Sequence, residues 1–97
     1  MKGGITAIAA YVPERRVTND ELAETVDTSD EWIVSHTGIR ERRLATAEQA
    51  SSDLGIEAVR KALEKAHLAP DEVDLLIGAT STPDYAPFPA TACVIQD

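Results

Sequence analysis

The sequence predicts a mixed α/β fold, and three observations lead to this prediction. Residues 54–66 repeat small and apolar side chains at helical spacing, and residues 73–79 form a short apolar run of the kind found in buried strands. Residues 5–12 are β-prone at their ends. The 97 residues suffice for one small domain, and we expect no domain boundary within residues 1–97.

The first expected strand covers residues 5–12. It stops at Pro13, because proline cannot donate a hydrogen bond to a sheet. A short helix should follow, since the run from Thr18 to Glu21 has the S/T-x-x-E pattern of a capping box. The strand therefore leads directly into a helical segment.

The same capping pattern recurs from Thr28 to Glu31 and predicts a second short helix with Thr28 at its N-cap. Trp32 and His36 are four residues apart, so they share a face of this helix. Gly38 should end it, because glycine readily adopts the left-handed conformation at a helix C-terminus.

The second half of the chain begins with the best-defined helix. Its apolar face repeats every four residues, at Leu54, Ala58, Ala62 and Ala66. A strand over residues 73–79, a proline-rich loop over residues 80–89 and a helix from Ala90 should follow. Two strands are too few for an independent sheet, so we expect the chain to be part of a longer protein.

Composition excludes several classes of function. The net charge of −8 disfavours nucleic-acid binding, and no apolar run approaches the ~20 residues that span a membrane. Cys93 is the single cysteine, so the chain has neither an internal disulfide nor a cysteine pair for a metal. We expect a cytoplasmic protein with no metal site.

Arginine is concentrated in two short stretches, Arg15–Arg16 and Arg40–Arg43. They form either a local anion site or ion pairs with neighbouring carboxylates on a solvated face, and composition does not separate these alternatives.

The string Asp-Thr-Ser-Asp-Glu-Trp-Ile at residues 27–33, followed by Thr37-Gly38-Ile39-Arg40, resembles the β-ketoacyl-acyl-carrier-protein synthase III family. The resemblance extends from Tyr11 to Cys93. It implies a thiolase-like layered α-β-α fold, of which this chain is part of the first half, and a homodimer. It also implies transfer of the acyl group of acetyl-CoA, or another short acyl-CoA, to a cysteine and decarboxylative condensation with malonyl-acyl-carrier protein. Coenzyme A is then part of a substrate, and no cofactor is implied.

The resemblance assigns the nucleotide end of CoA to Thr28 and Trp32, with the indole stacked on adenine. A core role for the only tryptophan is the alternative. His36 replaces an arginine common in the family at this position, so its contribution to CoA binding should be weaker.

The resemblance also places the catalytic nucleophile, a cysteine, and its histidine and asparagine partners beyond Asp97. Cys93, within the last expected helix, should be a buried structural residue, and the isolated chain should be inactive. His67 is expected to be a benign residue at the end of a helix.

Phe88 corresponds in the family to a phenylalanine that crosses the dimer interface and shapes the partner's acyl pocket. Alternatively, it anchors a loop of its own subunit. Two other functions remain open for the whole chain. One is a different thiolase-fold condensing enzyme with another acyl substrate, and the other is a non-catalytic acyl-CoA-binding module.

Overall fold

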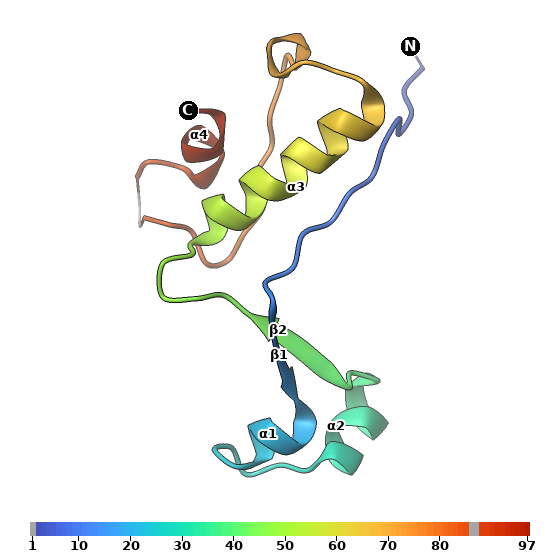
Figure 1. Cartoon of the computed structure of the whole chain (residues 1–97), viewed down its shortest axis with the longest axis vertical. Helices are drawn as coiled ribbons and strands as arrows, with labels where there is room; N and C mark the ends of the chain where they lie inside the picture. Colours follow the sequence, from blue (N-terminus) through green and yellow to red (C-terminus); the bar gives the residue numbers. More distant parts are fainter. Residues whose placement is uncertain (1, 86–87) are drawn as a thin grey trace. The chain divides into compact units, whose positions relative to one another are not determined.

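The computed structural model describes residues 2–85 and 88–97, so Pro87 of the expected loop lies outside the described residues. The chain is mixed α/β and divides into two compact units (Figure 1). Unit 1 comprises Met1–Tyr11 and Ala47–Asp97, and unit 2 comprises Val12–Thr46. The absence of a domain boundary stays a prediction, because compactness alone does not tell whether two units fold together.

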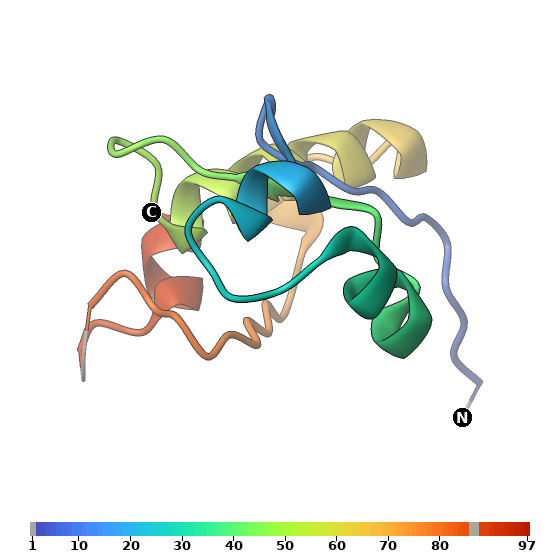
Figure 2. The same cartoon turned by 90° about the horizontal axis from the view of Figure 1, so that it is seen from below.

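Unit 2 contains a short antiparallel strand pair that the sequence did not predict. Strand β1 (Arg15–Thr18) pairs with β2 (Glu41–Leu44), so that Arg15 lies opposite Leu44 and Thr18 opposite Glu41. Helices α1 (Asn19–Ala23) and α2 (Asp30–Thr37) lie between the two strands in the sequence. In Figure 2 the loop that joins the two helices is visible along its whole length.

For the two short helices, the predicted boundaries at Thr18 and Gly38 are confirmed, and the predicted start of the second helix is shifted by one residue. The hydroxyl of Thr18 caps α1 by accepting a 3.2 Å hydrogen bond from the backbone N–H of Glu21. The predicted N-cap of α2 is wrong by one residue, because Ser29, not Thr28, accepts the backbone N–H of Trp32 at 3.2 Å. Gly38 ends α2 with φ 73°, as predicted.

Asn19 lies at the centre of unit 2 and is only 1% exposed. Its Nδ2 donates 2.8 Å hydrogen bonds to Oδ1 of Asp30 and to the carbonyl of Ile39. Its Oδ1 accepts a 2.6 Å bond from Arg42. One buried side chain therefore connects the start of α1 with α2, with β2 and with the segment between them.

Unit 1 is built on helix α3 (Ser51–Ala66), which confirms the most regular helical pattern of the sequence. The helix ends at His67, which has a left-handed backbone with φ 56°. A 3-10 helix, η1 (Pro70–Glu72), follows. Helix α4 (Thr91–Gln96) was also predicted, and it packs on α3 at Gly55, where an added Cβ would lie 2.6 Å from Cδ1 of Ile95.

The prediction of a strand over residues 5–12 is wrong. Among the described residues the segment has no partner strand, and Ile5 and Ile8 are 80% and 71% exposed. The carbonyls of Ile8 and Ala10 instead accept hydrogen bonds from Lys65 at 2.9 Å and Lys61 at 3.4 Å, which hold the segment beside α3 (Figure 1). A β-prone sequence becomes a strand only where a second backbone completes the ladder.

The strand predicted over residues 73–79 is wrong for the same reason. The structure has no strand there, and Leu75 and Ile77 are 75% and 80% exposed. The described residues of the following loop contain neither helix nor strand, which confirms the effect of the prolines.

Asp84 connects this loop to the two α-helices of unit 1, α3 and α4. Its Oδ1 accepts a 2.8 Å hydrogen bond from the backbone N–H of Ser52, in the first turn of α3, and its Oδ2 accepts the Ser52 hydroxyl. The backbone N–H of Asp84 donates to the hydroxyl of Thr91, at the start of α4, at 3.4 Å. The N-cap residue of α3 is Ala50, whose side chain cannot accept a hydrogen bond, so Asp84 supplies the missing acceptor from a distant part of the chain.

Candidate functional site

Unit 2 has an open hollow at the end of α1, the following loop and the first turns of α2. It is lined by Leu22, Val26, Asp27, Thr28, Ser29, Trp32 and Ile33. Two of the predicted site residues, Thr28 and Trp32, therefore line one surface. Leu22 and Val26 were not predicted as site residues; Leu22 lies in α1, and Val26 lies in the loop after it, where its backbone N–H donates to the carbonyl of Leu22 at 3.0 Å.

Trp32 is 55% exposed, which disfavours a purely structural role in the core. An indole on a helix surface that borders an open hollow is suited to stack on a planar ligand. Trp32 lies in the first turn of α2, as predicted, and borders the hollow from this position.

His36 contacts Trp32 directly. The two rings stack with centroids 4.2 Å apart and an interplanar angle of 18°. Nδ1 of His36 lies 2.8 Å from the carbonyl oxygen of Trp32, so this nitrogen carries the proton and donates it. The prediction that the two residues share a helix face is confirmed, and their rings are in direct contact. His36 is not among the residues that line the hollow.

The side-chain hydroxyl of Thr28 lies in an environment that is unusual for a polar group. Its Oγ1 is buried and has no hydrogen-bond partner among the described residues. Burying an unpaired hydroxyl costs about 1–3 kcal/mol, so such a group is a candidate for binding a polar ligand atom. The displacement of the N-cap from Thr28 to Ser29 leaves this hydroxyl available.

The arginine clusters divide between several roles. Arg15 makes an exposed ion pair with Glu21 at 2.7 Å, as one of the two alternatives predicted. Arg42 donates to the carbonyl of Val17 at 3.1 Å as well as to Asn19, and Arg43 donates to the carbonyl of Pro13 at 2.7 Å. Arg42 and Arg43 thus connect separate backbone segments of unit 2.

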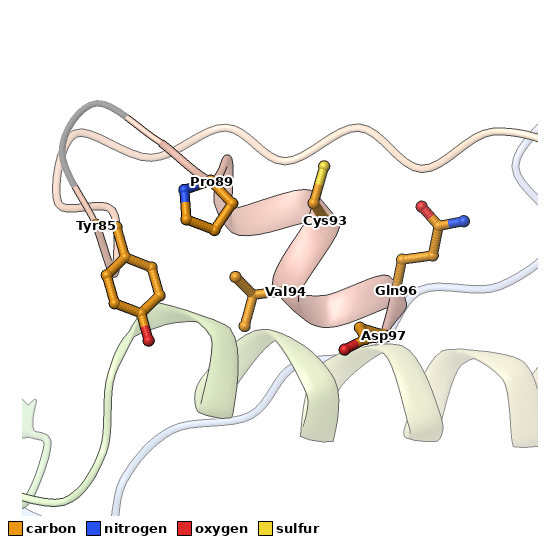
Figure 3. Close-up of a pocket in the computed structure, with 6 residues that line it drawn as sticks. All are labelled: Tyr85, Pro89, Cys93, Val94, Gln96 and Asp97. Atoms are coloured by element: carbon orange, nitrogen blue, oxygen red, sulfur yellow. The ribbon is translucent and has the colours of Figure 1, made fainter.

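Cys93 is exposed, so the prediction of a buried structural cysteine is wrong. Helix α4 is only six residues long and covers too little surface to enclose it. Figure 3 shows its sulfur directed away from Val94 and Tyr85, in a hollow lined also by Pro89, Gln96 and Asp97. This lining contains no histidine to activate a thiol.

Phe88 is 82% exposed, so its ring has little contact with its own chain. This disfavours the alternative in which it anchors its own subunit, and the crossing of a dimer interface stays a prediction. Over residues 2–85 and 88–97, no three acidic, histidine or cysteine side chains come together as metal ligands would. In the same residues no helix has both the length and the apolar surface needed to cross a membrane.

Comparison with known proteins identifies relatives of this chain. It is 48% identical over 95 residues to the β-ketoacyl-[acyl-carrier-protein] synthase III of Campylobacter jejuni and 53% identical over 93 residues to that of Caldanaerobacter subterraneus. These alignments cover 98% and 96% of the chain. The chain is a homologue of part of β-ketoacyl-[acyl-carrier-protein] synthase III. It spans 29% and 28% of the length of these two relatives.

Solved structures agree with the sequence comparison. The synthase III of Aquifex aeolicus matches with a TM-score of 0.86 and 46% identity, over 95% of this chain and 29% of that protein. The priming β-ketosynthase of a polyketide pathway matches with a TM-score of 0.85 and 34% identity, over 95% of this chain and 27% of that one. The fold of a synthase III is therefore present over this part of its length. No protein-family model matches the chain.

Proposed function

We propose that this chain forms part of the CoA-binding region of a β-ketoacyl-[acyl-carrier-protein] synthase III. The complete enzyme would transfer an acyl group from acetyl-CoA, or another short acyl-CoA, to a cysteine and condense it with malonyl-acyl-carrier protein. The observation that carries the proposal is the identity of about one half to synthases III along nearly the whole chain. We place the enzyme in the cytoplasm, as a homodimer.

Within this region, Trp32 and Thr28 would contact the nucleotide end of CoA, and His36 would contribute more weakly to CoA binding. The open hollow beside an exposed indole supports this assignment, as does the unpaired hydroxyl of Thr28. Phe88, with its exposed ring, would contribute to the acyl pocket of the partner subunit.

The catalytic cysteine, histidine and asparagine would lie outside these residues, so the chain alone should not be acylated. The exposed Cys93 is far from meeting the requirements of an activated nucleophile, since no histidine lines its hollow.

Binding is tested by calorimetric titration of the 97-residue chain with CoA. Trp32→Ala should weaken binding at least about five-fold, because a base stacked on an aromatic ring contributes about 1–3 kcal/mol. Tyr85→Ala is the matched control, since Tyr85 and Trp32 are both 55% exposed and Tyr85 lies outside the hollow. No saturable binding, or equal effects of the two substitutions, would refute the assignment of the site.

Acylation is tested separately, by intact-mass analysis and peptide mapping after incubation with acetyl-CoA. We expect an unmodified chain. An acyl group on Cys93 that is absent from Cys93→Ala would mean that the nucleophile had been placed wrongly.

A second candidate is a condensing enzyme with a different acyl substrate. It is favoured by the 34% identity to the priming β-ketosynthase. The acyl-CoA preference of the complete protein, measured with acetyl-CoA and with longer acyl-CoAs, separates the two candidates.

A further inference from the structure

We propose that His36 acts on Trp32 and not on the nucleotide: it holds the indole from one side, so that CoA stacks only on the side that faces the hollow. This inference rests on the proposed function, since it concerns how the same site receives CoA. It makes His36 a positioning residue and gives Trp32 a single available face.

The distance between the two rings is the first argument. A base inserted between two aromatic rings needs centroids about 7 Å apart, twice a contact distance of about 3.5 Å. The rings of Trp32 and His36 are 4.2 Å apart and nearly parallel, at 18°. The space between them is therefore filled, and a nucleotide cannot enter without displacing the imidazole.

The imidazole is also held in place by hydrogen bonds. Nδ1 of His36 donates to the carbonyl of Trp32 at 2.8 Å and lies 3.1 Å from the hydroxyl of Ser35. That hydroxyl donates to the same carbonyl at 3.0 Å. Swinging the imidazole aside would break the stack and the Nδ1 hydrogen bond together, so the ligand-free arrangement resists opening.

The hollow beside the indole is where we expect the ligand to approach. Trp32 lines it together with Thr28, Leu22 and Val26, and His36 is not among its lining residues. Thr28 is a lining residue whose hydroxyl is buried and has no hydrogen-bond partner among the described residues. A planar heteroaromatic ligand that enters here can stack on the indole without disturbing His36.

The fixed indole should favour binding, because a side chain already held in one rotamer loses less entropy when the ligand arrives. Removing the imidazole then frees Trp32 and weakens CoA binding. If the imidazole were instead a cover that CoA must displace, its removal would strengthen binding. The two models therefore predict effects of opposite sign.

The experiment compares the unaltered chain with His36→Ala and His36→Phe. Phenylalanine keeps a stacking ring but lacks the Nδ1 donor. His67→Asn removes the other histidine at a left-handed position that asparagine tolerates, and it serves as the control. Because Trp32 is the only tryptophan, its time-resolved fluorescence anisotropy reports local motion of this one indole. Calorimetric titration with CoA gives the affinity of each variant.

We expect His36→Ala to add a fast component to the anisotropy decay and to weaken CoA binding about two- to ten-fold, the range of an aromatic pair. His36→Phe should restore the slow decay and most of the affinity, and His67→Asn should leave both unchanged. His36 is exposed, so these variants should fold like the unaltered chain.

An unchanged anisotropy decay in His36→Ala, or tighter CoA binding, would refute the role of His36. Failure of every variant, and of the unaltered chain, to bind CoA would refute the proposed function instead. In that case the anisotropy still decides whether His36 fixes the indole, so the two failures are distinguishable.

Discussion

The guanidinium of Arg42 donates a 2.6 Å hydrogen bond to Oδ1 of Asn19, a side chain that is 1% exposed. Arg42 belongs to β2 and Asn19 to α1, so this single bond joins elements separated by 23 positions in the sequence. The amide nitrogen of Asn19 is at the same time bonded to Asp30, at the start of the helix that carries Trp32.

Asn19→Ala should therefore destabilise unit 2 by about 2–4 kcal/mol, because several buried polar groups lose their partner together. Thermal unfolding followed by the fluorescence of Trp32 measures this effect. Asp20→Ala changes the exposed neighbour of Asn19 and should have little effect. Equal stability of the two variants would show that the Asn19 hydrogen bonds contribute nothing.

Thr28→Val should have opposite effects on stability and on binding. Valine has nearly the same shape and removes the buried, unpaired hydroxyl, so the ligand-free chain should gain about 1 kcal/mol. CoA binding should become about three- to ten-fold weaker if this hydroxyl contacts the ligand, since a hydrogen bond contributes about 0.5–1.5 kcal/mol. Thermal unfolding and calorimetric titration test the two parts, and a loss of stability would contradict the first.

Gly38→Ala should destabilise the end of α2 by about 1–2 kcal/mol, because Gly38 has φ 73° and the left-handed region is unfavourable for alanine. Nothing lies within 4 Å of a Cβ added there, so the effect is one of backbone conformation alone. Gly38→Asn should cost less, since asparagine tolerates this region. Hydrogen exchange of the Gly38 amide, which donates to Val34 at 2.8 Å, provides the measurement.

Asp84→Ala should loosen unit 1 by about 1–2 kcal/mol, the usual effect of losing a helix N-cap. Asp84→Asn keeps an acceptor for the backbone N–H of Ser52 and should lose less. Amide exchange in the first turn of α3 measures the change. Protection that is the same in both variants as in the unaltered chain would show that Asp84 does not cap this helix.

The sequence predicted the elements that depend on neighbouring residues. Thr18 and Gly38 act as helix boundaries through hydrogen bonds and backbone angles within one turn, and the pattern of α3 is a property of its own 16 residues. The choice between Thr28 and Ser29 as N-cap was less well determined, because both are adjacent hydroxyl residues with similar capping tendency.

The elements that were missed depend on distant partners. Strands β1 and β2 are short and rich in arginine, with no alternation of apolar residues that would predict a sheet. Their pairing is held by bonds such as that between Arg42 and Val17, which no local pattern reveals. Residues 73–79 show the opposite error: their composition predicted a strand, but in the part of the chain that the structure describes no second strand lies beside them to form the ladder.

The candidate site was predicted in its residues but not in its arrangement. The spacing of Trp32 and His36 placed them on one face, whereas the contact between their rings depends on two rotamers and on the Nδ1 hydrogen bond. The unpaired hydroxyl of Thr28 likewise follows from the displaced N-cap and could not be seen in the sequence.

The close approach of Ile95 to Gly55 has a consequence for the order in which unit 1 folds. Helix α4 has only six residues, too few to persist in water without a surface to pack on. That surface exists only once α3 has formed around residue 55, and the bridge from Asp84 to Thr91 likewise requires the first turn of α3. Helix α4 should therefore form late, and the exposed thiol of Cys93 within it offers a natural place for a probe that times this last step.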